Sequence, residues 1–140
     1  MRHHTIPRIV TKLLIPVILL FGLYVQFHGD FSAGGGFQAG VIFAAGFILY
    51  NIIFGLDIGK SILSVNTSKY LMALGVILYL MVGFLGILLG GNFLEYNYLS
   101  NTPINGQLLG IFLVELGVGL TVSNVMVLVF YSFNDISEEK

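Results

Sequence analysis

Residues 70–90 read YLMALGVILYLMVGFLGILLG, an apolar stretch without a charged side chain. A helix needs about 20 apolar residues to cross the hydrocarbon core of a bilayer, and this stretch has that length. Three further stretches share its length and apolar character, and they cover residues 9–27, 37–56 and 108–133. The sequence therefore predicts four transmembrane helices.

The composition agrees with this prediction. Hydrophobic residues make up 56% of the chain and charged residues 9%, whereas about a quarter of the residues of a soluble domain are charged. A surface with so few charges has to face lipid or other buried protein. We therefore expect residues 1–140 to form a single all-α membrane domain, an integral bundle of four transmembrane helices.

Lysine and arginine predict the orientation of these helices, because cytoplasmic segments of membrane proteins are enriched in both residues. The six lie at the start of the first helix, between the second and third helices, or after the fourth: Arg2, Arg8, Lys12, Lys60, Lys69 and Lys140. The other two connections contain neither residue. Both termini and the middle connection are therefore expected to be cytoplasmic.

Several kinds of chemistry are excluded or disfavoured by the sequence. The chain has no cysteine, so neither a disulfide framework nor a thiolate metal site can form. A net charge of −1 gives no electrostatic case for nucleic acid. We find no nucleophile paired with a base, no paired carboxylates and no nucleotide-binding loop. The sequence therefore predicts no catalytic residue, no metal site and no cofactor, and it disfavours an autonomous enzyme.

Glu115 is the acidic residue inside a predicted helix. It is expected about 10 Å inside the fourth helix on the outer-leaflet side. A carboxylate at such a depth is costly, and intramembrane acids are usually functional. Glu115 is thus a candidate relay group for protons or cations, or a fixed negative charge beside an ion path. The alternative is a structural anchor for a partner helix.

Residues 28–40 read HGDFSAGGGFQAG and join the first two predicted helices. His28 and Asp30 are candidates for proton exchange at the outer face, since histidine titrates near neutral pH. Composition alone favours a simpler interpretation, in which both are interfacial polar residues that end the first helix. The triple glycine lacks the lysine and hydroxyl residue of a phosphate-binding loop. It is expected to permit an unusual backbone at the membrane boundary.

The fourth predicted helix contains several small residues, and Gly119 and Ser123 share the face of Glu115. Such residues let helix axes approach closely in lipid. The candidates for close helix packing are Gly110, Gly117, Gly119 and Ser123. The second and third predicted helices also have faces of small residues. All of these faces either contact other polypeptides or only hold this bundle together, and the sequence favours neither alternative.

Residues 28–40 resemble the H-G-x-x-x-P-G-G-G-F-Q-x-G signature of the B subunit of Mrp-type multisubunit Na⁺/H⁺ antiporters, the MnhB/MrpB family. The signature residues are Gly34, Gly35, Gly36, Phe37, Gln38 and Gly40. Residues 110–122, GIFLVELGVGLTV, resemble that family's acidic last helix. The resemblance covers essentially the whole chain. Ala33 departs from it, because the family has proline there.

The resemblance implies an accessory subunit of a hetero-oligomeric complex that exchanges cytoplasmic Na⁺ for external H⁺. In that family the B subunit lies in the bacterial cell membrane beside the C-terminal region of the large A subunit and near small membrane subunits. The large subunits carry the main translocating residues. The resemblance also leaves two alternatives: a purely structural subunit, or the corresponding subunit of a hydrogenase-type, redox-driven ion pump.

Overall fold

The computed structural model describes residues 5–29 and 34–138, with side chains described as far as Asp135. The helices are α1 (Thr5–Phe27), α2 (Gly36–Phe54), α3 (Leu56–Ile62), α4 (Val65–Leu88), the 3₁₀ helix η1 (Tyr96–Leu99) and α5 (Pro103–Glu138). The described part of the chain contains no strand. Four helices, α1, α2, α4 and α5, are long and apolar enough to cross a membrane. The prediction of an all-α fold with four transmembrane helices is confirmed.

The helix bounds differ from the apolar stretches in two places that affect the site. The last helix begins at Pro103 and not near Leu108, so its first turns include the polar Asn105 and Gln107. Proline is favoured at a first helical position because its missing N–H has no partner there. The short helix α3 was not predicted; it fills most of the middle connection.

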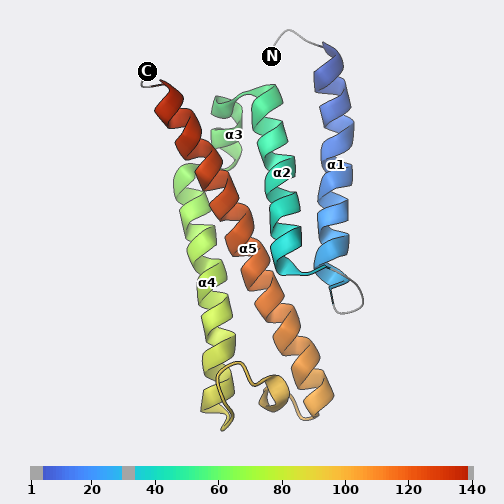
Figure 1. Ribbon diagram of the computed structural model, residues 1–140, viewed down its shortest axis with the longest axis vertical. Helices are drawn as coiled ribbons and strands as arrows, with labels where there is room; N and C mark the ends of the chain where they lie inside the picture. The colour runs from blue at the N-terminus through green and yellow to red at the C-terminus, as the bar shows by residue number, and fades with distance from the viewer. Residues whose placement is uncertain (1–4, 30–33, 139–140) are drawn as a thin grey trace.

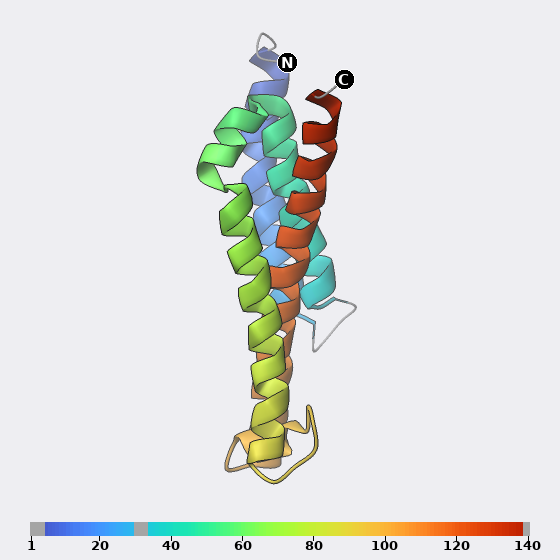
Figure 2. The same cartoon turned by 90° about the vertical axis from the view of Figure 1, so that its left-hand side faces the viewer.

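The four long helices lie side by side in the order α1, α2, α5, α4 (Figure 1). Contacts follow this order: α5 packs against α4 on one side and α2 on the other, and α1 packs mainly against α2. Figure 2 shows the same row from its side. Each outer helix of the row therefore has one long neighbour, and much of its surface faces outward.

Two glycine contacts set the spacing of α5 from its neighbours. A Cβ atom on Gly40 of α2 would lie 2.8 Å from the carbonyl oxygen of Gly119. On the other side, a Cβ atom on Gly75 of α4 would lie 2.6 Å from the carbonyl oxygen of Gly117. Both positions need glycine because any side chain would push the helices apart. Small residues have this role in membrane helix packing because lipid provides no hydrophobic drive for association.

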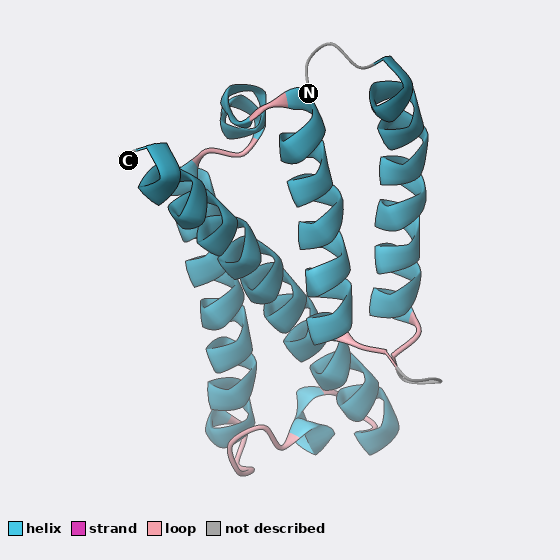
Figure 3. Ribbon diagram, turned by 45° about the horizontal axis from the view of Figure 1, so that its top comes forward, coloured by secondary structure: helices cyan, strands magenta, loops and turns pink. Residues whose placement is uncertain are grey.

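Polar contacts fix the end of the row at which α3 lies. The Tyr131 hydroxyl donates a hydrogen bond of 2.9 Å to the Leu63 carbonyl oxygen. The Lys60 ammonium forms a 2.8 Å ion pair with Asp135. These bonds tie α3 and the residue after it to the last turns of α5. The tilted view in Figure 3 shows α3 near the C-terminal end of α5.

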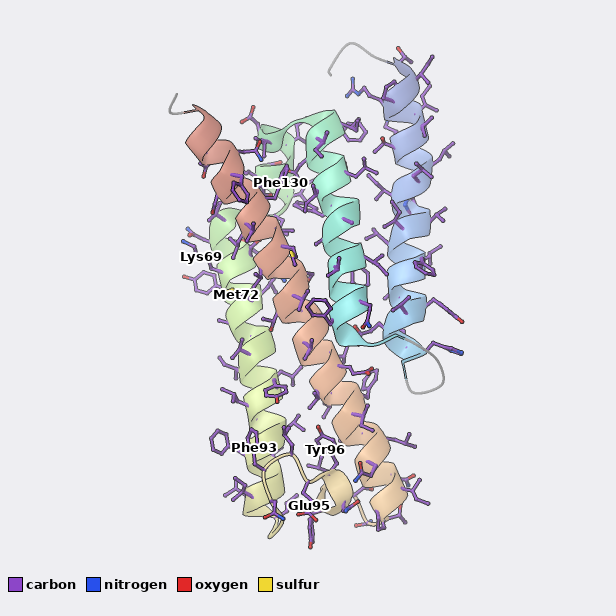
Figure 4. All side chains as sticks on the ribbon, in the orientation of Figure 1. Lys69, Met72, Phe93, Glu95, Tyr96 and Phe130 are labelled. Atoms are coloured by element: carbon purple, nitrogen blue, oxygen red, sulfur yellow. The ribbon has the colours of Figure 1, made fainter. Side chains whose placement is uncertain are left out.

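The opposite end is closed by residues 89–102. The backbone N–H and side-chain amide of Asn92 donate hydrogen bonds of 2.8 and 2.9 Å to Glu95. The Phe93 ring meets the Phe84 ring edge-on, with 5.9 Å between the ring centroids. Tyr96 is also partly covered at this end, and this burial raises the pKa of its hydroxyl group. In Figure 4, Glu95 and Tyr96 lie at this end, whereas Lys69 lies toward the other.

The first helix begins and the last helix ends at the same end of the row (Figure 1). The distribution of lysine and arginine predicts that this end is cytoplasmic. A green fluorescent protein fused after Lys140 should therefore fluoresce, and alkaline phosphatase at that position should be inactive. Fusions within residues 92–101 should give the reverse pattern. Active phosphatase at the C-terminus would contradict the predicted topology and indicate the opposite orientation.

Replacing Gly40 by alanine should loosen the contact between α2 and α5. The new methyl group would meet the Gly119 carbonyl oxygen and the Val122 Cβ atom of α5, which can yield only if the helices separate. We expect the free energy of unfolding to fall by about 1–3 kcal/mol. Thermal unfolding of the detergent-solubilised chain, followed by tyrosine fluorescence, measures this loss. Ala45→Leu, on an exposed position of α2, is the control and should leave the midpoint temperature nearly unchanged.

Candidate functional site

Glu115 of α5 lies against the beginning of α2. A Cβ atom on Gly36, the first residue of α2, would overlap the backbone carbonyl oxygen of Glu115. Only glycine can therefore occupy position 36 at this separation of the two helices. The contact brings the acidic residue of the last helix to the glycine segment that follows the first helix.

The Glu115 carboxylate itself lies against two more glycines. A Cβ atom on Gly29 would lie 3.0 and 3.1 Å from its two oxygens, and one on Gly35 would lie 3.1 Å from one of them. We call Gly29, Gly35 and Gly36 the glycine cradle. The cradle lets the main chain approach a carboxylate more closely than residues with side chains would permit.

Gly35 has a second requirement for glycine. Its backbone has φ 130° and ψ −179°, which residues with a Cβ atom rarely adopt. This conformation starts α2 directly after the turn, and the Gly35 carbonyl oxygen accepts a 3.0 Å hydrogen bond from the Ala39 N–H. Gly35 thus both turns the chain and leaves room for the carboxylate.

The cradle lies deeper than expected. Glu115 is twelve residues after Pro103, or about 18 Å along α5, and not about 10 Å. Its neighbour Gly117 packs against Gly75 and Tyr79, near the middle of α4 (Val65–Leu88). Figure 1 shows the same relation, because the connection from α1 to α2 ends well short of the far ends of α4 and α5. The cradle is therefore near the mid-depth of α4, and not at its end.

Gln26, in the last turn of α1, is a polar residue that sequence reasoning did not select. Its side chain is 4% exposed. A Cβ atom on Gly119, one turn from Glu115 in α5, would lie 2.7 Å from Gln26 Oε1 and 3.2 Å from the Gly36 carbonyl oxygen. Three helices thus bring polar atoms together at this junction. A lone glutamine near the end of an apolar helix resembles an ordinary interfacial residue, so the sequence offered no signal.

The other candidates from the glycine segment are only partly described. The His28 ring stacks on Tyr24 at 4.9 Å between ring centroids. Phe37 and Gln38 are exposed in the first turn of α2. Asp30 and Ala33 lie outside the described residues, so the predicted role of Asp30 stays a prediction.

The small residues of α5 have different neighbours. Gly110 packs against the Tyr96 ring of η1, Gly117 against α4, and Gly119 against α1 and α2. Ser123 lines a pocket between α2, α4 and α5. These four residues therefore lie on different sides of α5 and make four different contacts, three of them within the row of long helices.

The arrangement is suited to holding and exposing a charge, and not to covalent chemistry. A partly exposed carboxylate lies against main-chain glycines, with an amide and a carbonyl group one turn further along α5. Within the described residues, no three His, Asp or Glu side chains gather as a metal site would require. The fold defines a multi-pass membrane protein with an acidic side chain inside one of its long apolar helices.

Comparison with known proteins identifies the family. Residues 6–128 match the family described as a domain related to the MnhB subunit of Na⁺/H⁺ antiporter. Proteins provisionally named antiporter subunit mnhB2 are 35% identical, in Staphylococcus haemolyticus over 133 residues and in Staphylococcus aureus strain Newman over 130 residues. Each match covers 91% of this chain and 92% of the relative.

The chain belongs to the MnhB family. It is a multi-pass bacterial membrane protein and an accessory subunit of a multisubunit Na⁺/H⁺ antiporter, so its partners include other subunits of that complex. It is a transporter subunit and not an enzyme. The resemblance seen in residues 28–40 and 110–122 is confirmed.

Replacing Gly35 by alanine tests the cradle. The change strains the backbone by about 1–3 kcal/mol and places a methyl group against the carboxylate. We expect Na⁺-dependent proton exchange, measured in membrane vesicles containing the complete complex, to fall strongly.

Gly90→Ala is the matched control. Gly90 also has a positive φ, 96°, but a Cβ atom there would meet nothing within 4 Å. It shares the backbone strain without touching Glu115, so exchange should be retained. Equal losses in the two variants would show that strain alone, and not the cradle, explains the effect.

Proposed function

We propose that Glu115 provides a carboxylate to an ion path of the antiporter and that the glycine cradle shapes the outer end of that path. The observation that carries the proposal is the contact of both carboxylate oxygens with Gly29 and of one with Gly35. This close packing of the Glu115 carboxylate against the two glycines fixes the position of a charge that is costly within a membrane. The transported ions are Na⁺ and H⁺.

The depth of the cradle supports this role. Irregular backbone at membrane depth is tolerated only where protein covers it or where it lines a water-filled cavity. Gly29 and Gly35 lie outside helices, near the level of the middle of α4. Either water reaches the carboxylate from the outer side or a neighbouring subunit covers the turn. In the first situation ions can approach Glu115 from the outer side, and in the second Glu115 lies at a boundary between subunits.

The row of helices supports a position beside larger subunits. Only 22% of the apolar window is buried in each of α1, α4 and α5, and 39% in α2. We propose that the large A subunit, through its C-terminal region, and small membrane subunits cover part of this surface, with lipid on the remainder. Both termini face the cytoplasm in this arrangement.

A structural role for Glu115 is the second candidate, and one observation favours it. The closest contact of the residue with α2 is made by its backbone carbonyl group and not by its carboxylate. In that case the side chain would only anchor the α1–α2 turn or a partner helix through hydrogen bonds.

Glu115→Ala separates transport from assembly. If the carboxylate is part of the ion path, exchange should fall by about 10-fold or more while the complex still migrates intact on a native gel. Full exchange in this variant would exclude the path role.

Glu115→Gln separates charge from hydrogen bonding, because glutamine keeps the size and polar atoms of the side chain. The ion-path role requires an ionisable group, so the glutamine variant should lose exchange as the alanine variant does. The structural role requires only the hydrogen bonds, so exchange in the glutamine variant should then be normal.

A further inference from the structure

Gln26 is a buried polar group that the proposed role of Glu115 leaves unused. Its side chain is 4% exposed, and its Nε2 atom has no hydrogen-bond partner among residues 5–29 and 34–138. An amide donor without a partner is costly in a low-dielectric interior. Buried polar groups of this kind are commonly satisfied by an internal water molecule.

The position of Gln26 relative to Glu115 is set by Gly119. Gln26 Oε1 and the Gly36 carbonyl oxygen both lie where a side chain of residue 119 would begin. Gly119 follows Glu115 by one helical turn on nearly the same face, about 6 Å along the axis toward the end at which α5 finishes. The amide is therefore the next polar group beyond the carboxylate on the inward side.

A further turn along the same helix leads to a mostly apolar pocket that contains two polar side chains. Ser123 and Asn124 line a pocket of about 200 Å³ between α2, α4 and α5, whose other walls include Ala44, Leu71 and Val127. The Asn124 Nδ2 atom donates to the Leu120 carbonyl oxygen at 2.7 Å, and the Ser123 hydroxyl donates to the same oxygen at 3.1 Å. A pocket of this size with polar atoms can hold several water molecules.

We propose that Gln26 Nε2 donates to a bound water molecule beside the Glu115 carboxylate, and that this water is the first of a short chain of water molecules leading to the Ser123–Asn124 pocket. Gln26 is then a positioning residue for proton movement, and the pocket is the next hydrated point on the way to the cytoplasmic end. A proton leaving the carboxylate passes to this water, which releases one of its own protons to the next water molecule of the chain, on the side of the pocket. The proposal rests on the ion-path role of Glu115.

Transport by a variant with an apolar residue in place of Gln26 distinguishes the proposal from simple packing. If Gln26 only fills space, an apolar residue of similar size removes an unsatisfied donor and should leave stability unchanged or raise it, with normal transport. If Gln26 holds the water, the same change leaves stability intact but interrupts proton movement. Stability and transport therefore have to be measured on the same variant.

The experiment uses the complete complex in membrane vesicles, with Gln26→Leu, Gln26→Asn and the control Gln107→Leu. Gln107 bonds to Asn97 at the opposite end of α5, outside the proposed path. We expect Gln26→Leu to lower the maximal exchange rate by about 10-fold or more. The Na⁺ concentration at half-maximal rate should stay unchanged. The thermal stability should not fall. Gln26→Asn retains an amide donor and should exchange well above the leucine variant, and Gln107→Leu should be normal.

Three results would overturn the proposal. Normal exchange in Gln26→Leu would show that the amide only packs. A raised half-maximal Na⁺ concentration with an unchanged maximal rate would make Gln26 a Na⁺ ligand instead of a water-binding group. No recovery in Gln26→Asn would show that shape and not the donor matters. Glu115→Ala is measured in parallel to separate the role of Gln26 from that of Glu115. If Glu115→Ala loses exchange and Gln26→Leu exchanges normally, the ion-path role of Glu115 stands and only the role of Gln26 is excluded.

Discussion

The contact between Gly36 and the main chain of Glu115 is the constraint on which the rest of this molecule depends. It joins the start of α2 to α5 at a distance that no other residue allows. Because α2 begins there, the connection from α1 has to end at the same level, which places Gly29 and Gly35 against the carboxylate. The site is thus a consequence of how closely two helices approach.

The same contact accounts for the depth of the site. The long helix α5 makes its outer turns against α4 and η1, and it meets α1 and α2 only further along. The α1–α2 pair is consequently displaced relative to the α4–α5 pair, as Figure 1 shows. The turn between α1 and α2 therefore lies near the level of the middle of α4 and not beside its end. Such a turn requires cover or water, and both are available in a multisubunit complex.

The row arrangement explains why the chain is a subunit and not a self-contained transporter. A row gives α5 two long neighbours but leaves α1 and α4 with one each. No enclosed pathway from one end to the other can be built from one row of helices alone. Its polar groups, Glu115, Gln26 and Ser123, can therefore act in transport only together with surfaces from other subunits.

The amino-acid sequence determined the class of the fold and the identity of the main candidate residue. Long uncharged stretches can only be membrane helices, because the unsatisfied backbone of any other structure is too costly in lipid. An acid within such a stretch is conspicuous for the same physical reason. The glycine signature and the acidic last helix also sufficed to indicate the family.

Only the tertiary structure decided that these features form one site. The glycine segment and Glu115 are far apart in the chain, and helical periodicity describes faces but not which faces meet. The start of α5 at Pro103 was hidden because polar Asn105 and Gln107 interrupt the apolar pattern without interrupting the helix. The sequence did not indicate Gln26 for a similar reason. Its burial results from its neighbours on α2 and α5. The type of a side chain carries no information about what packs against it.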